Sequence, residues 1–214
     1  MTLNWINWIC ASLIIYMRYI TSFLFLLSCF TIGAQEIELD SSGQLPFLTL
    51  ANEVNSWKEL RSYEGRFRIV MPGEVEEKSY TLATDVGDLT YRTFYCQLPL
   101  KGSDNLMYML SYVDYPEGAI HSDSIALIPE FFEATMDAAA QSVKGDLVYS
   151  GTDNYKGYPG RRWRIDYLRG SAVIKTRAVI VEHRYYAIQT ITKKDKNLNL
   201  STDKFFESFT IFVD

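Results

Sequence analysis

The feature that most constrains this chain is the segment 107–115, which has the character of a strand and is apolar on both of its alternating faces. One face carries Met107, Met109 and Val113, and the other carries Tyr108, Leu110 and Tyr112. A strand with this pattern is typical of the interior of a sheet that is covered on both sides. We therefore expect a layered fold with this segment near its centre.

Other segments with strand character lie on both sides of a single helical stretch. They alternate, or are rich in β-branched and aromatic residues, and turn residues bound them. The predicted strands are residues 67–71, 78–83, 89–98, 147–149, 161–168, 172–181 and 185–192, with a tight turn at 85–88.

The helical stretch is predicted from apolar residues that repeat at helical spacing over residues 128–143. Ser122, Asp123 or Ser124 can cap its start, and Gly145 lies where helices commonly end. A second, short helix is expected over residues 201–208.

The order of strands, a helix, strands and a helix, without an internal repeat, predicts an α+β fold with a largely antiparallel sheet. We expect Ser201 to cap the second helix. One domain, residues 57–214, accommodates all of these elements.

The first 34 residues have the composition of a secretory leader. They contain one charged residue, Arg18, followed by a largely apolar run over 19–30 and small residues that end at Ala34. The apolar run is too short to span a bilayer, which takes about 20 residues. We interpret residues 1–34 as a signal peptide that is cleaved after Ala34, which leaves an acidic spacer over residues 35–56.

Two features of the leader leave alternatives open. Residues 1–16 place a second apolar stretch ahead of the only charge, so we interpret Met17 as the initiator and 1–16 as a spurious extension; the alternative is an uncleaved signal anchor. Cys29 lies in a sequence that loosely resembles a bacterial lipobox, so lipidation at Cys29 is a second alternative. A cysteine in an apolar leader is more often a small hydrophobic residue.

The chain after Ala34 has the composition of an acidic globular protein. Its 180 residues contain 20 Lys and Arg against 26 Asp and Glu, with thirteen Tyr and nine Phe. This aromatic content excludes a disordered chain, and the acidic balance argues against a nucleic-acid partner. Cys96 is the single cysteine after Ala34, so an intrachain disulfide is not expected.

Three short motifs resemble those of the PsbP-like domains. Residues 64–73 (EGRFRIVMPG) are similar to the opening pattern G-x-F-x-V-x-x-P-G, residues 157–160 (GYPG) to a G-x-P-G turn, and residues 205–209 (FFESF) to the closing F-x-x-S-F. The resemblance implies an α-β-α sandwich with a central antiparallel sheet over about residues 57–213.

The family that this resemblance names includes the extrinsic subunit of the oxygen-evolving complex and many exported bacterial proteins of unknown role. It brings no catalytic motif that could be carried over to this sequence. The leader looks bacterial, so we expect an exported protein of the bacterial periplasm or cell envelope.

Catalytic and metal-binding patterns are weak in this sequence. The two histidines, His121 and His183, are more readily explained as residues of a helix start and a turn than as catalytic bases. No His-x-x-x-His pair, cysteine pair or calcium loop is present, so we expect no metal and no cofactor. Cys96 lies within a strand, where a buried inert thiol is the expectation.

The strongest candidate surface is a group of cations on one predicted hairpin. If residues 161–168 and 172–181 pair across a turn at Arg169-Gly170, the apolar side chains share one face. The opposite face then pairs Arg162 with Arg177 and Arg164 with Lys175. Like charges placed opposite each other destabilise a sheet, so this face calls for a compensating anion.

The next hairpin extends the same face. A turn at His183-Arg184 would place Thr190 beside Arg177 and Thr192 beside Lys175. The structural explanation is that acids of a covering helix neutralise the cations; the candidate acids are Glu130, Glu133, Asp137 and Glu207. The functional explanation is a site for an anionic ligand or an acidic protein, formed by Arg162, Arg164, Lys175, Arg177 and Thr190.

The leading hypothesis from the sequence is a non-enzymatic, exported binding or accessory protein. One alternative is an envelope hydrolase that uses His121 or His183 with nearby carboxylates. Another is a membrane-tethered structural lipoprotein, so we expect contact with a membrane only through a lipidated Cys29 or an uncleaved leader.

Overall fold

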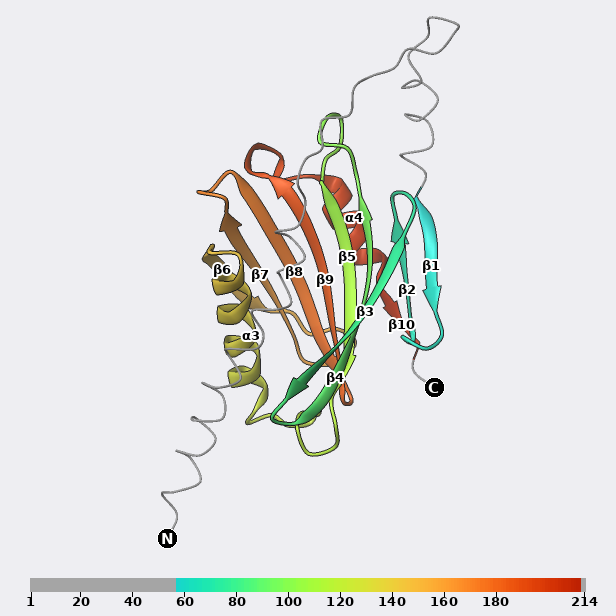
Figure 1. The fold of residues 1–214 in the computed structure, drawn as a ribbon, viewed down its shortest axis with the longest axis vertical. Helices are drawn as coiled ribbons and strands as arrows, with labels where there is room; N and C mark the ends of the chain where they lie inside the picture. Colours follow the sequence, from blue (N-terminus) through green and yellow to red (C-terminus); the bar gives the residue numbers. More distant parts are fainter. Residues whose placement is uncertain (1–56, 213–214) are drawn as a thin grey trace, which may run out of the picture.

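The computed structural model of the chain describes residues 57–212 (Figure 1). The predicted signal peptide, Cys29 and the acidic spacer lie outside the described residues. Within the described part, no helix is both long enough and apolar enough to cross a bilayer.

A seven-stranded antiparallel sheet forms the centre of the molecule, in the order β3-β4-β5-β9-β8-β7-β6. Its strands are β3 (Glu76–Thr84), β4 (Gly87–Gln97), β5 (Met107–Asp114), β6 (Asp146–Thr152), β7 (Gly160–Tyr167), β8 (Ala172–Val181) and β9 (Arg184–Lys193). Most of their ends lie within two residues of a predicted end, since their alternation and β-branching were visible in the sequence. β6 extends further than predicted because its outer residues are exposed and carry no apolar alternation.

A second, three-stranded sheet has the order β1-β2-β10. It consists of β1 (Lys58–Ser62), β2 (Phe67–Met71) and β10 (Thr210–Ile211). β2 was predicted, whereas β1 and β10 were not. β1 is a polar strand with a mostly exposed pattern, and β10 has only two residues, so neither gives a clear periodic signal.

Helix α3 (Ile128–Ser142) lies on one face of the large sheet, and helix α4 (Leu200–Ser208) lies with the small sheet on the other (Figure 1). A short 3₁₀ helix, η2 (Lys194–Lys196), connects β9 to α4. The chain therefore has the predicted α+β fold, with a central antiparallel sheet covered on both faces.

Both helix starts differ from the prediction. Residues 122–124 do not cap α3; Leu127 is its N-cap and makes no side-chain cap bond, and Pro129 lies in its first turn. Proline fixes a helical φ and lacks the N–H that would be unpaired there, so it can start a helix without a polar cap. Asn199, not Ser201, caps α4, and its side-chain oxygen accepts a hydrogen bond from Thr202 N at 2.8 Å.

Two apolar clusters pack against opposite faces of the large sheet. β5 contributes Tyr108, Leu110 and Tyr112 to the cluster beneath α4 and the small sheet, and Val113 to the cluster beneath α3. This confirms that the strand with two apolar faces is covered on both sides. Burial of large side chains in both clusters, each worth about 1.5–3 kcal/mol, fixes which face each residue of the sheet presents.

Candidate functional site

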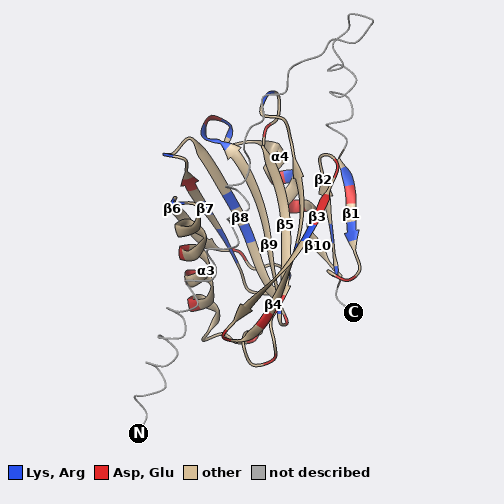
Figure 2. Ribbon diagram, viewed as in Figure 1, with Lys and Arg blue, Asp and Glu red and all other residues tan. Residues whose placement is uncertain are grey.

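The predicted pairing of β7 with β8 is present in the structure. Arg162 lies opposite Arg177 and Arg164 opposite Lys175, while Trp163 lies opposite Thr176 on the other face. Figure 2 shows Lys and Arg on these two strands. The four residues Arg162, Arg164, Lys175 and Arg177 are called the cation cluster below.

The predicted pairing of β8 with β9 is wrong by two residues. The turn is Glu182-His183, and Val181 pairs with Arg184. Thr190 therefore lies beside Lys175 rather than beside Arg177. A shift of two residues keeps every side chain on its predicted face, so Thr190 still shares the face of the cation cluster.

Asp153 holds the two arginines nearest the β6–β7 loop. Its Oδ2 accepts hydrogen bonds from Arg162 Nε and from Arg177 Nε, each at 2.7 Å. Arg177 also donates from Nη1 to Phe206 O of α4 at 3.1 Å. Arg177 is largely covered, whereas the side chain of Arg162 is 48% exposed. Two guanidinium groups thus share one carboxylate oxygen, and one of them reaches solvent.

Asp166 holds the next pair of cations. Arg164 donates to its two oxygens from Nε at 2.6 Å and from Nη2 at 3.1 Å, and Lys194 Nζ donates to Oδ2. Burial alone would raise the pKa of Asp166, but the hydrogen bonds from Arg164 and Lys194 outweigh it and lower that pKa. Asp166 is therefore a fully used acceptor.

Lys175 has no carboxylate hydrogen-bonded to it in the described structure. Its Nζ donates to the backbone oxygen of Asn197, and Arg164 Nη1 donates to the side-chain oxygen of the same residue at 3.3 Å. Burial and the neighbouring Arg164 lower the pKa of Lys175, against the opposing effect of Asp203. Beside it, the buried Thr190 Oγ1 has no hydrogen-bond partner within the described chain.

The acids expected to neutralise these cations do not do so. Glu130, Glu133 and Asp137 belong to α3, which packs on the opposite face of the sheet, and no ion pair joins Glu207 to the cluster among the described residues. The neutralising acids are instead Asp153 and Asp166. With Lys194, this face holds five cations. Four of them bond to the two carboxylates, and only Asp203 acts on Lys175, so a surplus of positive charge remains.

The outer border of the cation cluster is the edge strand β6. Gly151 lies opposite Arg162 and Tyr149 opposite Arg164. Gly151 has no side chain to cover Arg162, and Tyr149 is half exposed. The cluster is therefore covered by α4 on its inner side and accessible at its β6 side, so the face is open only in part.

The structure brings the two histidines together. The rings of His121 and His183 lie 4.6 Å apart between centroids, although 62 positions separate the residues in the chain. His183 Nδ1 lies 3.0 Å from Ile120 O, and His121 Nδ1 accepts a hydrogen bond from Asp123 N at 3.1 Å. Both Nδ1 atoms are thus engaged by backbone groups, which gives the rings a role in joining the β5–α3 loop to the β8–β9 turn.

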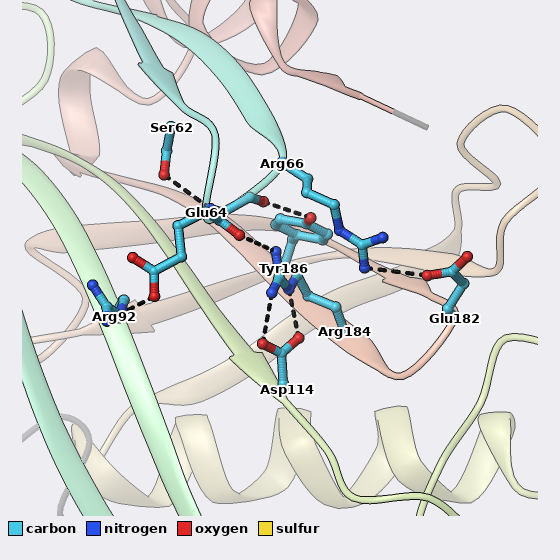
Figure 3. Close-up of polar contacts among 9 residues, drawn as sticks. Ser62, Glu64, Arg66, Arg92, Asp114, Glu182, Arg184 and Tyr186 are labelled. Carbon is cyan, nitrogen blue, oxygen red and sulfur yellow. Dashed lines mark hydrogen bonds and ion pairs between the residues drawn. The ribbon is translucent and has the colours of Figure 1, made fainter. Parts of the chain in front are cut away.

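A second polar cluster, which sequence reasoning missed, lies near these histidines (Figure 3). Arg184 donates to the two oxygens of Asp114 at 2.5 and 2.6 Å and to Glu64 O at 2.7 Å. Tyr186 donates from its hydroxyl to Gly65 O at 2.7 Å. Burial would lower the pKa of Arg184, but its bonds with Asp114 raise it, so the guanidinium stays charged.

This second cluster joins the two sheets. Arg66 pairs with Glu182 at 3.1 Å and Arg92 with Glu64 at 2.7 Å, so the β1–β2 turn is attached to β4 and to the β8–β9 turn. The sequence gave no sign of this second cluster, because its bonded partners are up to 120 residues apart in the chain.

Cys96 is a buried free thiol within β4. Burial raises the pKa of the Cys96 thiol to about 11, with a smaller contribution from Glu76, which agrees with the expected inert thiol. Over residues 57–212, no three His, Cys, Asp or Glu side chains are grouped as metal ligands.

No protein-family model matches the chain, and no curated protein matches it. Among solved structures, it is similar to the solution structure of cyanobacterial PsbP (CyanoP) from Synechocystis sp. PCC 6803. The TM-score is 0.49 and the identity 12%, over 74% of this chain and 94% of that chain. The fold resembles that of PsbP. The likeness concerns the fold alone.

The residues that carry the PsbP-like motifs have packing roles in this structure. A Cβ on Gly65 would lie 2.5 Å from the Phe67 ring, and one on Gly160 would clash with Asp153 O. In the closing motif, Phe205 and Phe209 are buried in the cluster beneath the small sheet. The motifs therefore describe packing, between the two sheets at Gly65 and within the large sheet at Gly160.

Proposed function

We propose that this chain is a non-enzymatic binding or accessory protein that holds an anionic ligand, or an acidic surface of a protein, at the cation cluster. The observation that carries the proposal is the charge balance on one sheet face. Arg162, Arg164, Arg177 and Lys194 share only two hydrogen-bonded carboxylates, Asp153 and Asp166, and Lys175 is hydrogen-bonded to neither, with only Asp203 acting on its charge.

The geometry of the cluster supports binding at its β6 side. Arg162 uses Nε for Asp153 and is half exposed, so its remaining donors are available for a carboxylate or phosphate. Thr190 Oγ1 adds a buried hydroxyl without a partner in the described chain, beside Lys175. Surplus charge with preset donors is what an anion site requires.

Charge reversal at Arg164 and Lys175 tests the proposal directly. The probes are inorganic phosphate and a hexaglutamate peptide. Isothermal titration calorimetry measures the binding of each probe to the full chain. We expect R164E/K175E to weaken binding of the better probe at least tenfold. The control R61E/R68E makes the same change in net charge on β1 and β2, where both arginines face Glu59.

Because R164E removes the partner of Asp166, a milder variant keeps the test sound. R162A/K175M removes two cations without placing new acids in the cluster, and thermal unfolding measures whether it folds. Binding that is unchanged in both double variants, or that falls equally in R61E/R68E, would sink the proposal.

We place the protein, also as a proposal, in the periplasm or envelope of a bacterium, with residues 1–34 removed on export. Intact-mass measurement of the exported protein tests this. A mass equal to that of a chain beginning at Gln35 supports cleavage, and a mass that includes residues 1–34 supports the anchor. A mass increased by a lipid on Cys29 supports the lipoprotein.

A further inference from the structure

Three loops meet at the end of the large sheet where β9 ends. They are the β4–β5 loop (98–106), the β7–β8 turn (168–171) and the segment from the end of β9 to the start of α4 (193–200). Lys194 N donates to Ser171 O at 2.9 Å, and Lys196 Nζ donates to Ser103 O at 2.8 Å. η2 therefore ties the other two loops into one surface, called the basic end below.

Four leucines project from the basic end. Leu100 is 64% exposed, Leu168 63%, Leu198 87% and Leu200 84%. Single exposed leucines are ordinary on a soluble protein. Four of them on three adjoining loops at one end of the molecule are not scattered, and such a group marks an interaction surface.

Leu168 occupies a backbone conformation that leucine rarely adopts. Its φ is 51°, followed by a φ of 56° at Arg169. Positions of this kind favour glycine, asparagine or aspartate, and a leucine there costs conformational energy. Since the side chain is mostly exposed, packing within the chain does not explain the residue. An exposed leucine at this position is suited to an apolar contact outside the chain.

The same loops are positively charged, although the chain is acidic. They contain the basic residues Lys101, Arg169, Lys193, Lys194 and Lys196, against two acids, Asp104 and Asp195. Figure 2 shows Lys and Arg at the loop tips of this end. Leucines thus stand among lysines and an arginine at the loop tips.

We propose that the basic end docks on an anionic lipid surface, with its leucines in the interfacial layer and its Lys and Arg at the headgroups. A lipid surface has anionic headgroups above an apolar layer. Exposed leucines with cations between them can therefore contact both layers at once. A second copy of this chain would bring like charges together. The proposal does not depend on anion binding at the cation cluster.

A tryptophan reporter tests the contact at one position. In the full chain, Leu198→Trp is compared with Ile125→Trp, since Ile125 is 82% exposed at the opposite end of the sheet. Vesicles contain brominated phosphatidylglycerol, which quenches tryptophan by contact. The four native tryptophans are present in both variants, so the quenching of the wild-type chain is subtracted from each. We expect at least twice as much quenching of the new tryptophan at 198 as at 125.

Charge and lipid composition provide the second arm. K101E/R169E/K193E, introduced with Leu198→Trp, should lower the vesicle partition coefficient at this site about a hundredfold, at about fivefold per residue. Vesicles of brominated phosphatidylcholine should quench the tryptophan at position 198 no more than the one at position 125. Equal quenching at 198 and 125 in anionic vesicles, or quenching at 198 that survives the charge reversal, would overturn the proposal.

Discussion

The two ends of the large sheet differ in charge and in how their loops are held. The basic end carries five Lys and Arg against two Asp, with four exposed leucines. The loops at the opposite end (residues 63–66, 85–86, 115–127, 153–159 and 182–183) carry six Asp and Glu against two Lys and Arg (Figure 2). We call these loops the acidic end.

Charge has a different use at each end. At the acidic end, the Arg66–Glu182 ion pair and the bond from Arg184 to Glu64 O join the small sheet to the large one, while Asp114 holds Arg184 within the large sheet. At the basic end, Lys101, Arg169 and Lys193 make no ion pair with a described residue, and the loops are held by bonds to backbone oxygens. The charges of the acidic end therefore stabilise the fold. At the basic end Lys194 and Lys196 are bonded within the chain, and Lys101, Arg169 and Lys193 are left available.

The largest expected effect comes from removing a charge at the acidic end. D114N leaves the buried Arg184 guanidinium with a neutral acceptor. We expect a loss of about 2 kcal/mol in the free energy of unfolding, less than for a fully buried pair because the Asp114 side chain is 56% exposed. The same change at the basic end, D195N, should cost less than about 0.5 kcal/mol, because the exposed Asp195 has no ion pair in the described chain. Urea unfolding measures both, and equal losses would contradict the comparison.

A smaller loss of stability is expected for D153N. Asp153 lies in a loop of the acidic end, and its carboxylate bonds to the cation cluster. Arg162 and Arg177 would lose their shared carboxylate, at a cost of about 1–2 kcal/mol. The same change should strengthen phosphate binding severalfold, because it frees two guanidinium groups. Calorimetry with phosphate checks this, and weaker binding would count against the proposed site.

Asp166 should make stability depend on pH in the acid range. Its pKa is lowered in the folded chain, so its contribution is fully present above the unfolded value of about 4. The contribution is lost as pH falls through the lower folded value. The stability of D166N should therefore fall less steeply below pH 4 than that of the wild type, as followed by circular dichroism. An unchanged slope would exclude this role.

The smallest effect is expected at Thr190, whose buried hydroxyl has no partner within the described residues. T190V keeps the shape and removes the unpaired group, so stability should stay the same or rise by up to about 1 kcal/mol. The control is T202V. Thr202 is equally buried, but its Oγ1 donates to Asn105 Oδ1 at 3.1 Å, and its loss should cost about 1 kcal/mol. A thermal unfolding series compares the two, and a matching loss in both would show that Thr190 is bonded.

How much of the fold could be predicted depended on periodicity. The core strands and α3 repeat apolar residues at regular spacing, so their existence and order were predictable. The second hairpin was placed two residues out of register because β9 is buried on both faces, and a shift of two keeps each residue on its own face. Only the turn residues could have decided the register, and Glu182 adopts a positive φ of 55° without being a typical turn former.

The strand residues of the candidate site were predictable, whereas its loop residues were not. The pairing of Arg162 with Arg177 and of Arg164 with Lys175 followed from the apolar face of the hairpin and from the predicted turn at Arg169-Gly170. Asp166, two positions after Arg164 on the same strand, was a signal that could have been used. Asp153 comes from a loop whose position depends on Gly160, where no side chain fits between Asp153 O and Ala178 O, and no local pattern reveals that closeness.

The ties between the loops of the basic end also bear on how fast and how tightly that end can bind. η2 is attached to the β7–β8 turn on one side and to the β4–β5 loop on the other. A binding surface that is already ordered loses little conformational entropy on contact, so more of the interaction energy remains as affinity. Loss of the Lys196–Ser103 bond would free the β4–β5 loop, and ordering that loop again on contact would lower the affinity.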